Sequence, residues 1–344
     1  MRILGVLALI GALVTTGCEA PEGAQAQGRS QIEAAIPPFP MQSCVNLGNA
    51  LEAEVEGSWG YTIRQEDLAI IQAAGFDGVR LPVRWDPHAS QIPPYRIDQR
   101  FMDRVAQVVD QAMGEGLMVQ LDVHHYEPLI SRPNDPRESA KFVAIWDQIA
   151  QRFSGYDGRL MFELLNEPYG EQWTNARLME LHAAALSVIR RTNPNRMVIL
   201  GGIQWNTLGG LEGYTPPDDP YVAMTYHHYG PYEFTHQNAE WLGAQAPRWN
   251  RVWGTRADVA ELERDAAQAA AYARRHGIAM QLGEFGVINT VPLAQRQQWL
   301  ATMRTANERL GIGWCVWDFG VAFNIYDRER RQWVPGAREA LGLH

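Results

Sequence analysis

The sequence predicts a TIM (β/α)8 barrel built as a single domain. From residue 43 onward, eight short apolar runs alternate with amphipathic stretches of helical period, the pattern of parallel strands covered by helices. Polar residues also gather where the apolar runs stop, on the face where such barrels carry their functional residues. No Ser/Thr/Pro-rich linker, second composition zone or internal repeat follows residue 43, so we expect one domain over 38–344.

The elements are expected in a regular order. The strands are expected at 43–48, 77–82, 117–123, 159–165, 196–201, 221–226, 278–283 and 312–318, and the helices at about 63–75, 99–114, 136–154, 174–192, 256–276 and 292–310. Thr62 with Gln65 suggests a capping box, Pro136 a first-turn proline, and Gly277 the end of a helix. The Gly- and Pro-rich segment 202–220 leaves the helix after the fifth strand undecided.

The N-terminus resembles an export signal. Met1-Arg2 precedes an apolar stretch from residue 3 to 14 that is too short to span a bilayer. The following Thr15-Thr16-Gly17-Cys18 resembles a bacterial lipoprotein cleavage box, although Thr15 stands where Leu or Val is usual. We expect a signal peptide over 1–17, lipidation of Cys18 and a flexible tether over 18–37, with plain secretion as the alternative. The protein is then expected to be exported, as a lipoprotein of the outer membrane or cell surface or as a periplasmic protein.

Composition and charge limit the partners. The chain has 344 residues, of which 46% are apolar, and a formal net charge of −9. A pI near 5.5 does not suit nucleic acid or an anionic membrane surface as a partner. A lipid anchor would then be the only link to a membrane, and we expect a monomer without a cofactor.

Two further cysteines lie in strand-like runs near the two ends of the predicted barrel. Cys44 and Cys315 would belong to its first and last strands, which are neighbours. A disulfide is possible in an oxidising compartment, but buried free thiols are the preferred interpretation. Because the chain has no Cys-x-x-Cys pair, a structural zinc site is not expected.

Polar side chains end seven of the eight predicted strands. They are, in chain order, Asn46, Asn49 and Glu52; Arg80; His124 and His125; Asn166 and Glu167; His227 and Tyr229; Glu284; and Trp317 and Asp318.

The two glutamates that follow the fourth and seventh strands can face each other across the mouth of a barrel. Glu167 precedes Pro168, which cannot continue a strand ladder, and Glu284 lies in a similar position. Such a pair can cleave a glycosidic bond, one carboxyl protonating the leaving oxygen and the other attacking the anomeric carbon. Arg80 would favour the ionised form of the attacking carboxylate. Asn166 could hold a sugar hydroxyl, and Trp317 offers a flat face to a pyranose ring.

Each residue also has a structural interpretation. A lone glutamate at a strand end is more often a cap or an ion-pair partner, and about half of the twelve Trp are expected to fill the core. His124-His125 suggests a metal site, but adjacent residues on a strand point to opposite faces and the motif offers no acidic or cysteine partner. Glu163, further inside the barrel, is expected to be structural. The hypothesis of a site that cleaves glycosidic bonds therefore rests on polar residues at seven strand ends together, and not on any single residue.

The strand ends carry six motifs, which are Asn46-Leu-Gly-Asn-Ala-Leu-Glu52, Val79-Arg-Leu-Pro82, Asp122-Val-His-His125, Leu165-Asn-Glu-Pro168, Tyr226-His-His-Tyr229 and Gly283-Glu-Phe-Gly286. Together they resemble glycoside hydrolase family 5, and the resemblance covers nearly the whole chain after residue 43. Pro231-Tyr-Glu-Phe-Thr-His-Gln237 is similar to a bacterial endoglucanase branch that also cleaves mannan and mixed-linkage glucans.

The resemblance implies a retaining enzyme without a metal and assigns roles by position. Glu167 would be the acid/base and Glu284 the nucleophile, with carboxyl groups about 5–5.5 Å apart. The other positions would contact the nucleophile or the sugars: Arg80 and Tyr229 the nucleophile; Asn166 the 2-hydroxyl; His124, His227 and Trp317 the sugar being cleaved; Asn49, Glu52, His236 and Trp241 the next sugar; and His125 either the substrate or His124. His228 and Gly230 depart from the family pattern near the expected cleft, which leaves glucan or mannan preference open.

The expected function is endo-β-1,4-glucan hydrolysis. A β-1,4-mannanase or an enzyme for mixed-linkage glucan or xyloglucan is the alternative. From other classes, we consider a non-hydrolytic glucan-binding surface lipoprotein, and a metal-dependent hydrolase using His124, His125 and His227. The intact pair of glutamate motifs argues against the binding protein.

Overall fold

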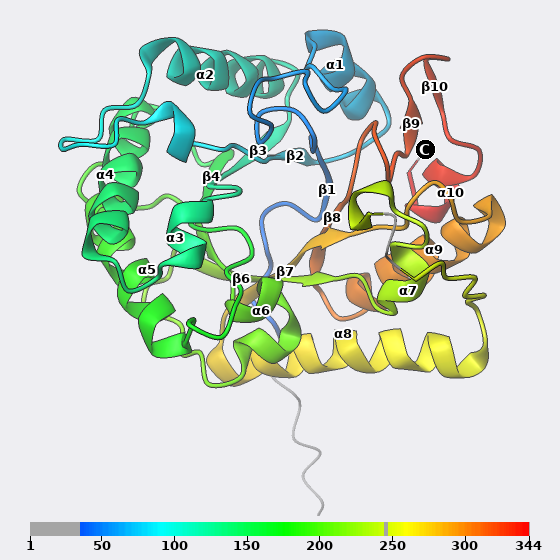
Figure 1. Cartoon of the computed structure of the whole chain (residues 1–344). Helices are drawn as coiled ribbons and strands as arrows, with labels where there is room; N and C mark the ends of the chain where they lie inside the picture. The colour runs from blue at the N-terminus through cyan, green and yellow to red at the C-terminus, as the bar shows by residue number, and fades with distance from the viewer. Residues whose placement is uncertain (1–34, 244–246, 344) are drawn as a thin grey trace, which may run out of the picture. The chain divides into compact units, whose positions relative to one another are not determined.

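The computed structural model describes residues 35–243 and 247–343, and within them eight parallel strands close a barrel in chain order (Figure 1). The predicted fold class is therefore confirmed. The strands are β1 (Ser43–Asn46), β2 (Gly78–Leu81), β3 (Met118–Asp122), β4 (Leu160–Glu163), β5 (Val198–Leu200), β6 (Val222–His228), β7 (Ala279–Phe285) and β8 (Gly313–Val316).

The six predicted helices are present in the described residues and lie around the barrel (Figure 1). They are α1 (Gln65–Ala73), α2 (Gln99–Gly114), α4 (Pro136–Arg152), α5 (Asn175–Arg190), α8 (Arg256–His276) and α9 (Leu293–Glu308). The undecided segment after β5 forms α6 (Ile203–Asn206) and the 3-10 turn η2 (Leu208–Leu211). Other short elements are η1 (Asp86–His88), α3 (Glu127–Ser131), α7 (Tyr232–Thr235), η3 (Glu240–Leu242), the hairpin β9 (Tyr326–Asp327) with β10 (Gln332–Trp333), and α10 (Ala337–Ala340).

The helix boundaries confirm two of three sequence signals. Asp135 caps α4 and Pro136 opens it, and Gly277 ends α8 in the left-handed conformation, which costs glycine little. The capping box at Thr62 was wrong, because α1 begins at Gln65 and its cap is Arg64. The backbone N–H of Arg64 donates to Asp67 Oδ2 at 3.1 Å, so an acidic residue one turn later performs the function expected of Gln65.

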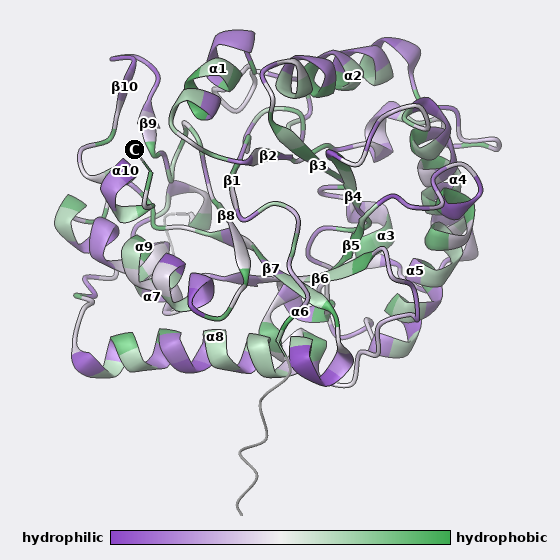
Figure 2. Cartoon of the chain, turned by 180° about the vertical axis from the view of Figure 1, so that it is seen from behind, coloured by the Kyte–Doolittle hydropathy of each residue, from purple (hydrophilic) through white to green (hydrophobic). Residues whose placement is uncertain are grey.

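Apolar side chains fill two compartments of the domain. The larger lies between strands and helices, and α8 shows the alternating hydrophilic and hydrophobic stripes of a helix with one buried face (Figure 2). The smaller fills the barrel interior at its N-terminal end: Phe39, Met41, Cys44, Met161, Ile199, Ala223, Ala279 and Cys315. Met41 crosses this end so closely that a Cβ on Gly78 would lie 2.4 Å from its sulfur. The polar residues are thereby confined to the opposite end.

The preferred interpretation of Cys44 and Cys315 as free thiols was wrong. The two residues are register partners on the adjacent strands β1 and β8, their Cα atoms are 4.3 Å apart, and they form a disulfide. Both are fully buried. The bond therefore joins the first strand to the last at the seam where the barrel closes.

None of the helices in 35–243 and 247–343 is long and apolar enough to cross a membrane. The expected signal peptide, the lipidation of Cys18 and the tether up to residue 34 lie outside the described residues and stay predictions.

Replacing both Cys44 and Cys315 by Ala is expected to lower the free energy of unfolding by about 2–4 kcal/mol, because the bond closes a loop with a sequence separation of 271. Equilibrium unfolding in urea under oxidising conditions measures the change. Wild-type protein unfolded with a thiol reductant is the matched control and should approach the midpoint of the double variant. Two results together would contradict the pairing. The wild type and the variant would have equal midpoints without reductant, and both Cys44 and Cys315 of the wild type would react with an alkylating reagent after unfolding without reductant.

Candidate active site

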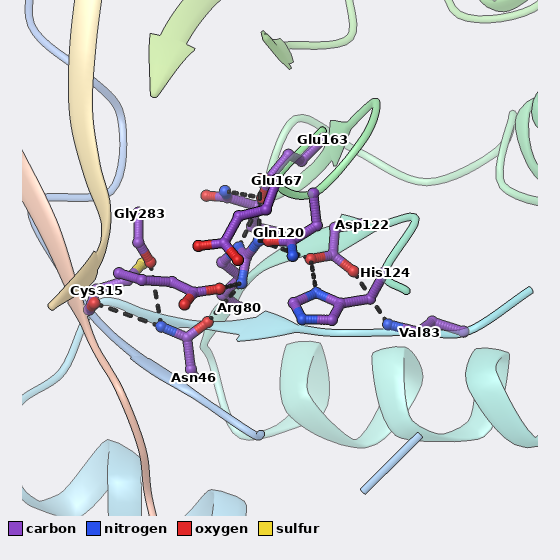
Figure 3. Close-up of polar contacts among 12 residues, drawn as sticks. Asn46, Arg80, Val83, Gln120, Asp122, His124, Glu163, Glu167, Gly283 and Cys315 are labelled. Carbon is purple, nitrogen blue, oxygen red and sulfur yellow. Dashed lines mark hydrogen bonds and ion pairs between the residues drawn. The ribbon is translucent and has the colours of Figure 1, made fainter. Parts of the chain in front are cut away.

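Arg80 is the centre of the polar cluster inside the barrel mouth (Figure 3). It projects from β2, is fully buried, and forms ion pairs with Glu163 (2.6 Å), Asp122 (2.7 Å) and Glu284 (2.8 Å). It also donates to the side-chain oxygen of Asn46 at 2.9 Å. A guanidinium without solvent needs all of its donors satisfied, so residues from several strands converge on it.

Glu284 lies near the C-terminal end of β7 and accepts two hydrogen bonds. Arg80 Nη1 donates to its Oε1 at 2.8 Å, and the Tyr229 hydroxyl donates to its Oε2 at 2.9 Å. Burial raises the pKa of Glu284 to about 7, while His227, Arg80 and the Tyr229 hydroxyl act in the opposite direction and favour the charged form. Both predicted partners of Glu284 are therefore in place.

Glu167 follows β4 and faces Glu284. Its backbone has φ +45°, in the left-handed region, and its Oε1 lies 2.7 Å from His227 Nδ1. Its side chain is 26% exposed, against 6% for Glu284, so Glu167 is the more accessible of the two carboxyls. Burial raises the pKa of Glu167 to about 8; the charge of Arg80 opposes this effect, and the charges of Glu163 and Asp122 add to it. An oxygen of Glu167 and an oxygen of Glu284 lie within 4.8 Å of each other.

The predicted neighbours of this pair surround it. Asn166 accepts from Arg80 Nη2 at 2.8 Å through its side-chain oxygen, which leaves its amide nitrogen as a donor. The ring of Trp317 stacks near His124, with centroids 5.9 Å apart and planes 12° apart. Gly48 permits the placement of Trp317, since a Cβ there would lie 2.7 Å from the indole.

His124 and His125 do not point to opposite faces, contrary to the expectation for a strand. Their rings meet edge to face with centroids 4.6 Å apart. The reason is that β3 ends at Asp122 and that His125 has φ +48°, so strand alternation no longer applies. His125 also meets the indole of Trp59 edge-on at 5.7 Å.

Asn49 and Glu52 lie together in the loop after β1. The Asn49 side chain donates to Asp318 Oδ2 at 3.2 Å. Glu52 is 1% exposed, and its carboxylate accepts the backbone N–H groups of Asn49 and Ala50. The structure thus gives Glu52 a loop-shaping position beneath Asn49, and contact of either residue with a sugar stays a prediction.

An aromatic cluster extends the site beyond the glutamates. His236 stacks on Tyr232 with centroids 4.0 Å apart and lies 6.3 Å from Trp241, which is 56% exposed. Phe323 lies between them, 5.2 Å from His236 and 6.0 Å from Trp241. The predicted residues His236 and Trp241 are therefore adjacent, and Tyr232 and Phe323 are members that the sequence analysis missed.

The placement of His228 near the cleft was wrong. Successive residues of β6 alternate, so His227 faces the barrel interior while His228 faces α8. His228 Nε2 lies 2.7 Å from Asp265 of α8. His228 therefore lies against the helix layer, away from Glu167 and Glu284.

In the part of the chain that the structure describes, one trio is arranged so that it could hold a metal ion. Its members are Glu167, His227 and Glu284, with ligand atoms within 4.8 Å of one another. This trio differs from the His124, His125 and His227 set of the metal-dependent alternative. Arg80, which is paired with Glu284 at 2.8 Å, opposes a further positive charge there.

Two residues of the cluster were not predicted as part of the site: Asp122 Oδ2 lies 2.8 Å from His124 Nδ1, and Gln120 donates to Glu163 at 2.7 Å. Asn46, predicted at a strand end without a role, accepts from Arg80. A signal was available for Asp122, because residues i and i+2 share a strand face and Asp122 precedes His124 by two positions.

Comparison with known proteins assigns the family. The model of the family described as Cellulase (glycosyl hydrolase family 5) matches residues 45–322. The chain belongs to glycoside hydrolase family 5. This family cleaves glycosidic bonds, and its members act with retention of configuration.

Several family 5 proteins are similar to this chain over most of its length. Endoglucanase H of Acetivibrio thermocellus is 37% identical over 288 residues, which are 83% of this chain but only 30% of that protein. The solved structure of Thermotoga maritima Cel5A with cellobiose has a TM-score of 0.83 at 37% identity, covering 87% of this chain and 96% of that one. The same enzyme with mannotriose has a TM-score of 0.84 at 36% identity, covering 88% and 97%.

Proposed function

We propose that this chain is a retaining endo-β-1,4-glucanase in which Glu284 is the nucleophile and Glu167 the acid/base. One observation carries the proposal: carboxyl oxygens of the two residues lie within 4.8 Å of each other, and their surroundings differ. This separation suits the spacing of about 5–5.5 Å in retaining enzymes and is shorter than the roughly 6.5–9.5 Å of inverting ones.

The different surroundings support the two roles. Glu284 receives hydrogen bonds from Arg80 and Tyr229, which stabilise a carboxylate. Glu167 contacts His227, whose own pKa is lowered by burial. Burial raises the pKa of both carboxyl groups, but only Glu284 accepts hydrogen bonds from Arg80 and Tyr229, so Glu284 ionises first and Glu167 keeps its proton. That is the protonation state that glycosylation requires.

The reaction is a double displacement. A carboxylate oxygen of Glu284 forms a bond to the anomeric carbon as the bond to the leaving oxygen breaks, and Glu167 gives that oxygen its proton. Glu167, now ionised, takes a proton from water, which attacks the anomeric carbon and releases Glu284. Asn166 keeps an amide donor for the 2-hydroxyl, and Trp317 forms the floor under the ring.

The substrate is proposed to be a β-1,4-glucan, with β-1,4-mannan as the second candidate. The relatives named endoglucanase and the cellobiose complex of the similar Cel5A support glucan. The mannotriose complex of that same enzyme is the observation that keeps mannan open. Because the chain spans 30% of Endoglucanase H, no other activity of that longer protein is carried over.

Glu284→Gln is expected to abolish turnover on every substrate, because a neutral amide cannot attack the anomeric carbon. Activity should fall to less than about one part in a thousand of the wild type, measured as reducing-end release. A folded variant, shown by an unchanged circular dichroism spectrum, that kept more activity would place the nucleophile elsewhere.

Glu167→Ala is expected to lose activity on cello-oligosaccharides but still to form the glycosyl-enzyme from an aryl cellobioside whose leaving group needs no proton. The burst of released phenol measures that step. Added azide should restore turnover, because this anion attacks the anomeric carbon of the glycosyl-enzyme without a general base and releases Glu284 as a glycosyl azide forms. If both substrates failed equally in a folded variant, the acid/base role would be refuted.

A parallel assay on carboxymethylcellulose, barley β-glucan, glucomannan, linear mannan and xyloglucan tests the substrate class. We expect the largest kcat/KM on the β-1,4-glucans, with products of mixed length as in endo cleavage. A kcat/KM on linear mannan above that on every glucan would replace the proposal with the mannanase, and inactivity on all five would support the binding protein.

A further inference from the structure

Glu163 forms a bidentate ion pair with the edge of the Arg80 guanidinium that faces away from Glu284. It accepts from Arg80 Nε at 2.6 Å and from Arg80 Nη2 at 2.9 Å, a two-point contact along one edge of the planar group. Both side chains are fully buried, and Gln120 Nε2 donates to Glu163 Oε2 at 2.7 Å. Figure 3 shows Glu163 on the strand that leads to Glu167.

This contact determines where the remaining donors of Arg80 point. The guanidinium is rigid and planar, so two fixed points on its Nε edge set the direction of Nη1. Nη1 then reaches Glu284 at 2.8 Å and Asn46 at 2.9 Å, and Nη2 reaches Asp122 at 2.7 Å and Asn166 at 2.8 Å. Glu163 thus holds the Arg80 guanidinium, and this guanidinium orients both Glu284 and Asn166. Glu284 is the proposed nucleophile, and Asn166 is proposed to bind the 2-hydroxyl.

We propose that Glu163 is a positioning residue that aims Arg80 at Glu284 and whose permanent negative charge keeps the proton of the pair on Glu167. The inference deepens the proposed function and rests on it. Glu163 itself is fully buried beneath the pair and has no role in contact with substrate.

The electrostatic part follows from the charges in the cluster, where Asp122 and His227 also face Arg80, Glu163 and Glu167. Burial raises the pKa of Glu163, but the charge and hydrogen bonds of Arg80, together with His227 and Gln120, outweigh burial and lower that pKa to about 2, so Glu163 is ionised at neutral pH. A fixed negative charge neutralises much of Arg80 and disfavours a second negative charge on Glu167, whose pKa it helps to raise. Without it, the positive charge of Arg80 would act on Glu167 and Glu284 with less opposition, and both would ionise at lower pH.

A neutral residue that merely filled the space would not have these effects. Gln120 is the comparison within the same interior: it is fully buried and touches Glu163, but it carries no charge. It provides the matched control, because replacing it with Met removes a hydrogen bond to Glu163 and leaves the charge of Glu163 in place.

The test is the pH profile of kcat/KM on cellotetraose for the wild type, Glu163→Gln, Glu163→Asp and Gln120→Met. We expect both limbs of the bell to move to lower pH in Glu163→Gln, the alkaline limb by about one pH unit. In Glu163→Asp the charge remains but the shorter side chain loses one of the two contacts. Its alkaline limb should therefore stay in place while kcat falls about tenfold or more. Gln120→Met should keep the wild-type alkaline limb.

An alkaline limb that stays in place in folded Glu163→Gln would overturn the inference, and so would an equal shift in Gln120→Met. If Glu163→Gln does not fold, Glu163→Asp decides: wild-type kcat or a displaced alkaline limb refutes the proposal. The pH profile of kcat/KM of the wild type on a dinitrophenyl cellobioside shows whether the inference about Glu163 fails or the proposed function itself fails. The dinitrophenolate leaving group needs no acid, so the alkaline limb should vanish on this substrate. If the limb persists, it does not belong to Glu167, and the proposed function fails.

Discussion

The buried positive charge of Arg80 is the constraint on which the rest of the site depends. A guanidinium removed from water is tolerated only when each N–H has an acceptor and the charge has counter-ions close by. Here the acceptors come from β1, β3, β4, the loop after β4, and β7. Placing one cation at the axis of the barrel therefore sets the positions of residues that are far apart in the chain.

The apolar filling of the other end makes this arrangement possible. Sulfur-containing and aliphatic side chains occupy the barrel interior below the cluster. In this low-polarity setting each ion pair is stronger than in water, and each unpaired group is more costly. The same setting raises the pKa of both Glu167 and Glu284, so the hydrogen bonds and charges around each carboxyl group decide which of them carries the proton.

The sequence predicted the fold and the outer part of the site well, for a physical reason. Apolar runs of strand length followed by polar residues are a local signal, and in a barrel all strand ends meet at one mouth. Arg80, Asn166, His227 and Tyr229 were therefore placed around the glutamates without coordinates. Glu163 was assigned a structural role because a polar residue inside an apolar run resembles an incidental core position.

The missed contacts depend on geometry that no local pattern contains. The pairing of Cys44 with Cys315 requires the register between β1 and β8, which spacing along the chain does not encode. The outward direction of His228 follows from the alternation of a β6 that extends to residue 228, two residues beyond the expected end. The meeting of His124 with His125 depends on a left-handed backbone residue. Only the error at His124 and His125 lies beyond the end of a strand, whereas the cysteines and His228 lie within paired strands whose register and length the sequence does not specify.

The bond between Cys44 and Cys315 can form only when nearly the whole chain has been synthesised. The second sulfur emerges from the ribosome only after almost the entire barrel has been made, because β8 is its last strand. Next to that seam stand Asn46 on one side and Trp317 on the other. A chain that stops before residue 315 therefore lacks both the bond between the first and last strands and Trp317.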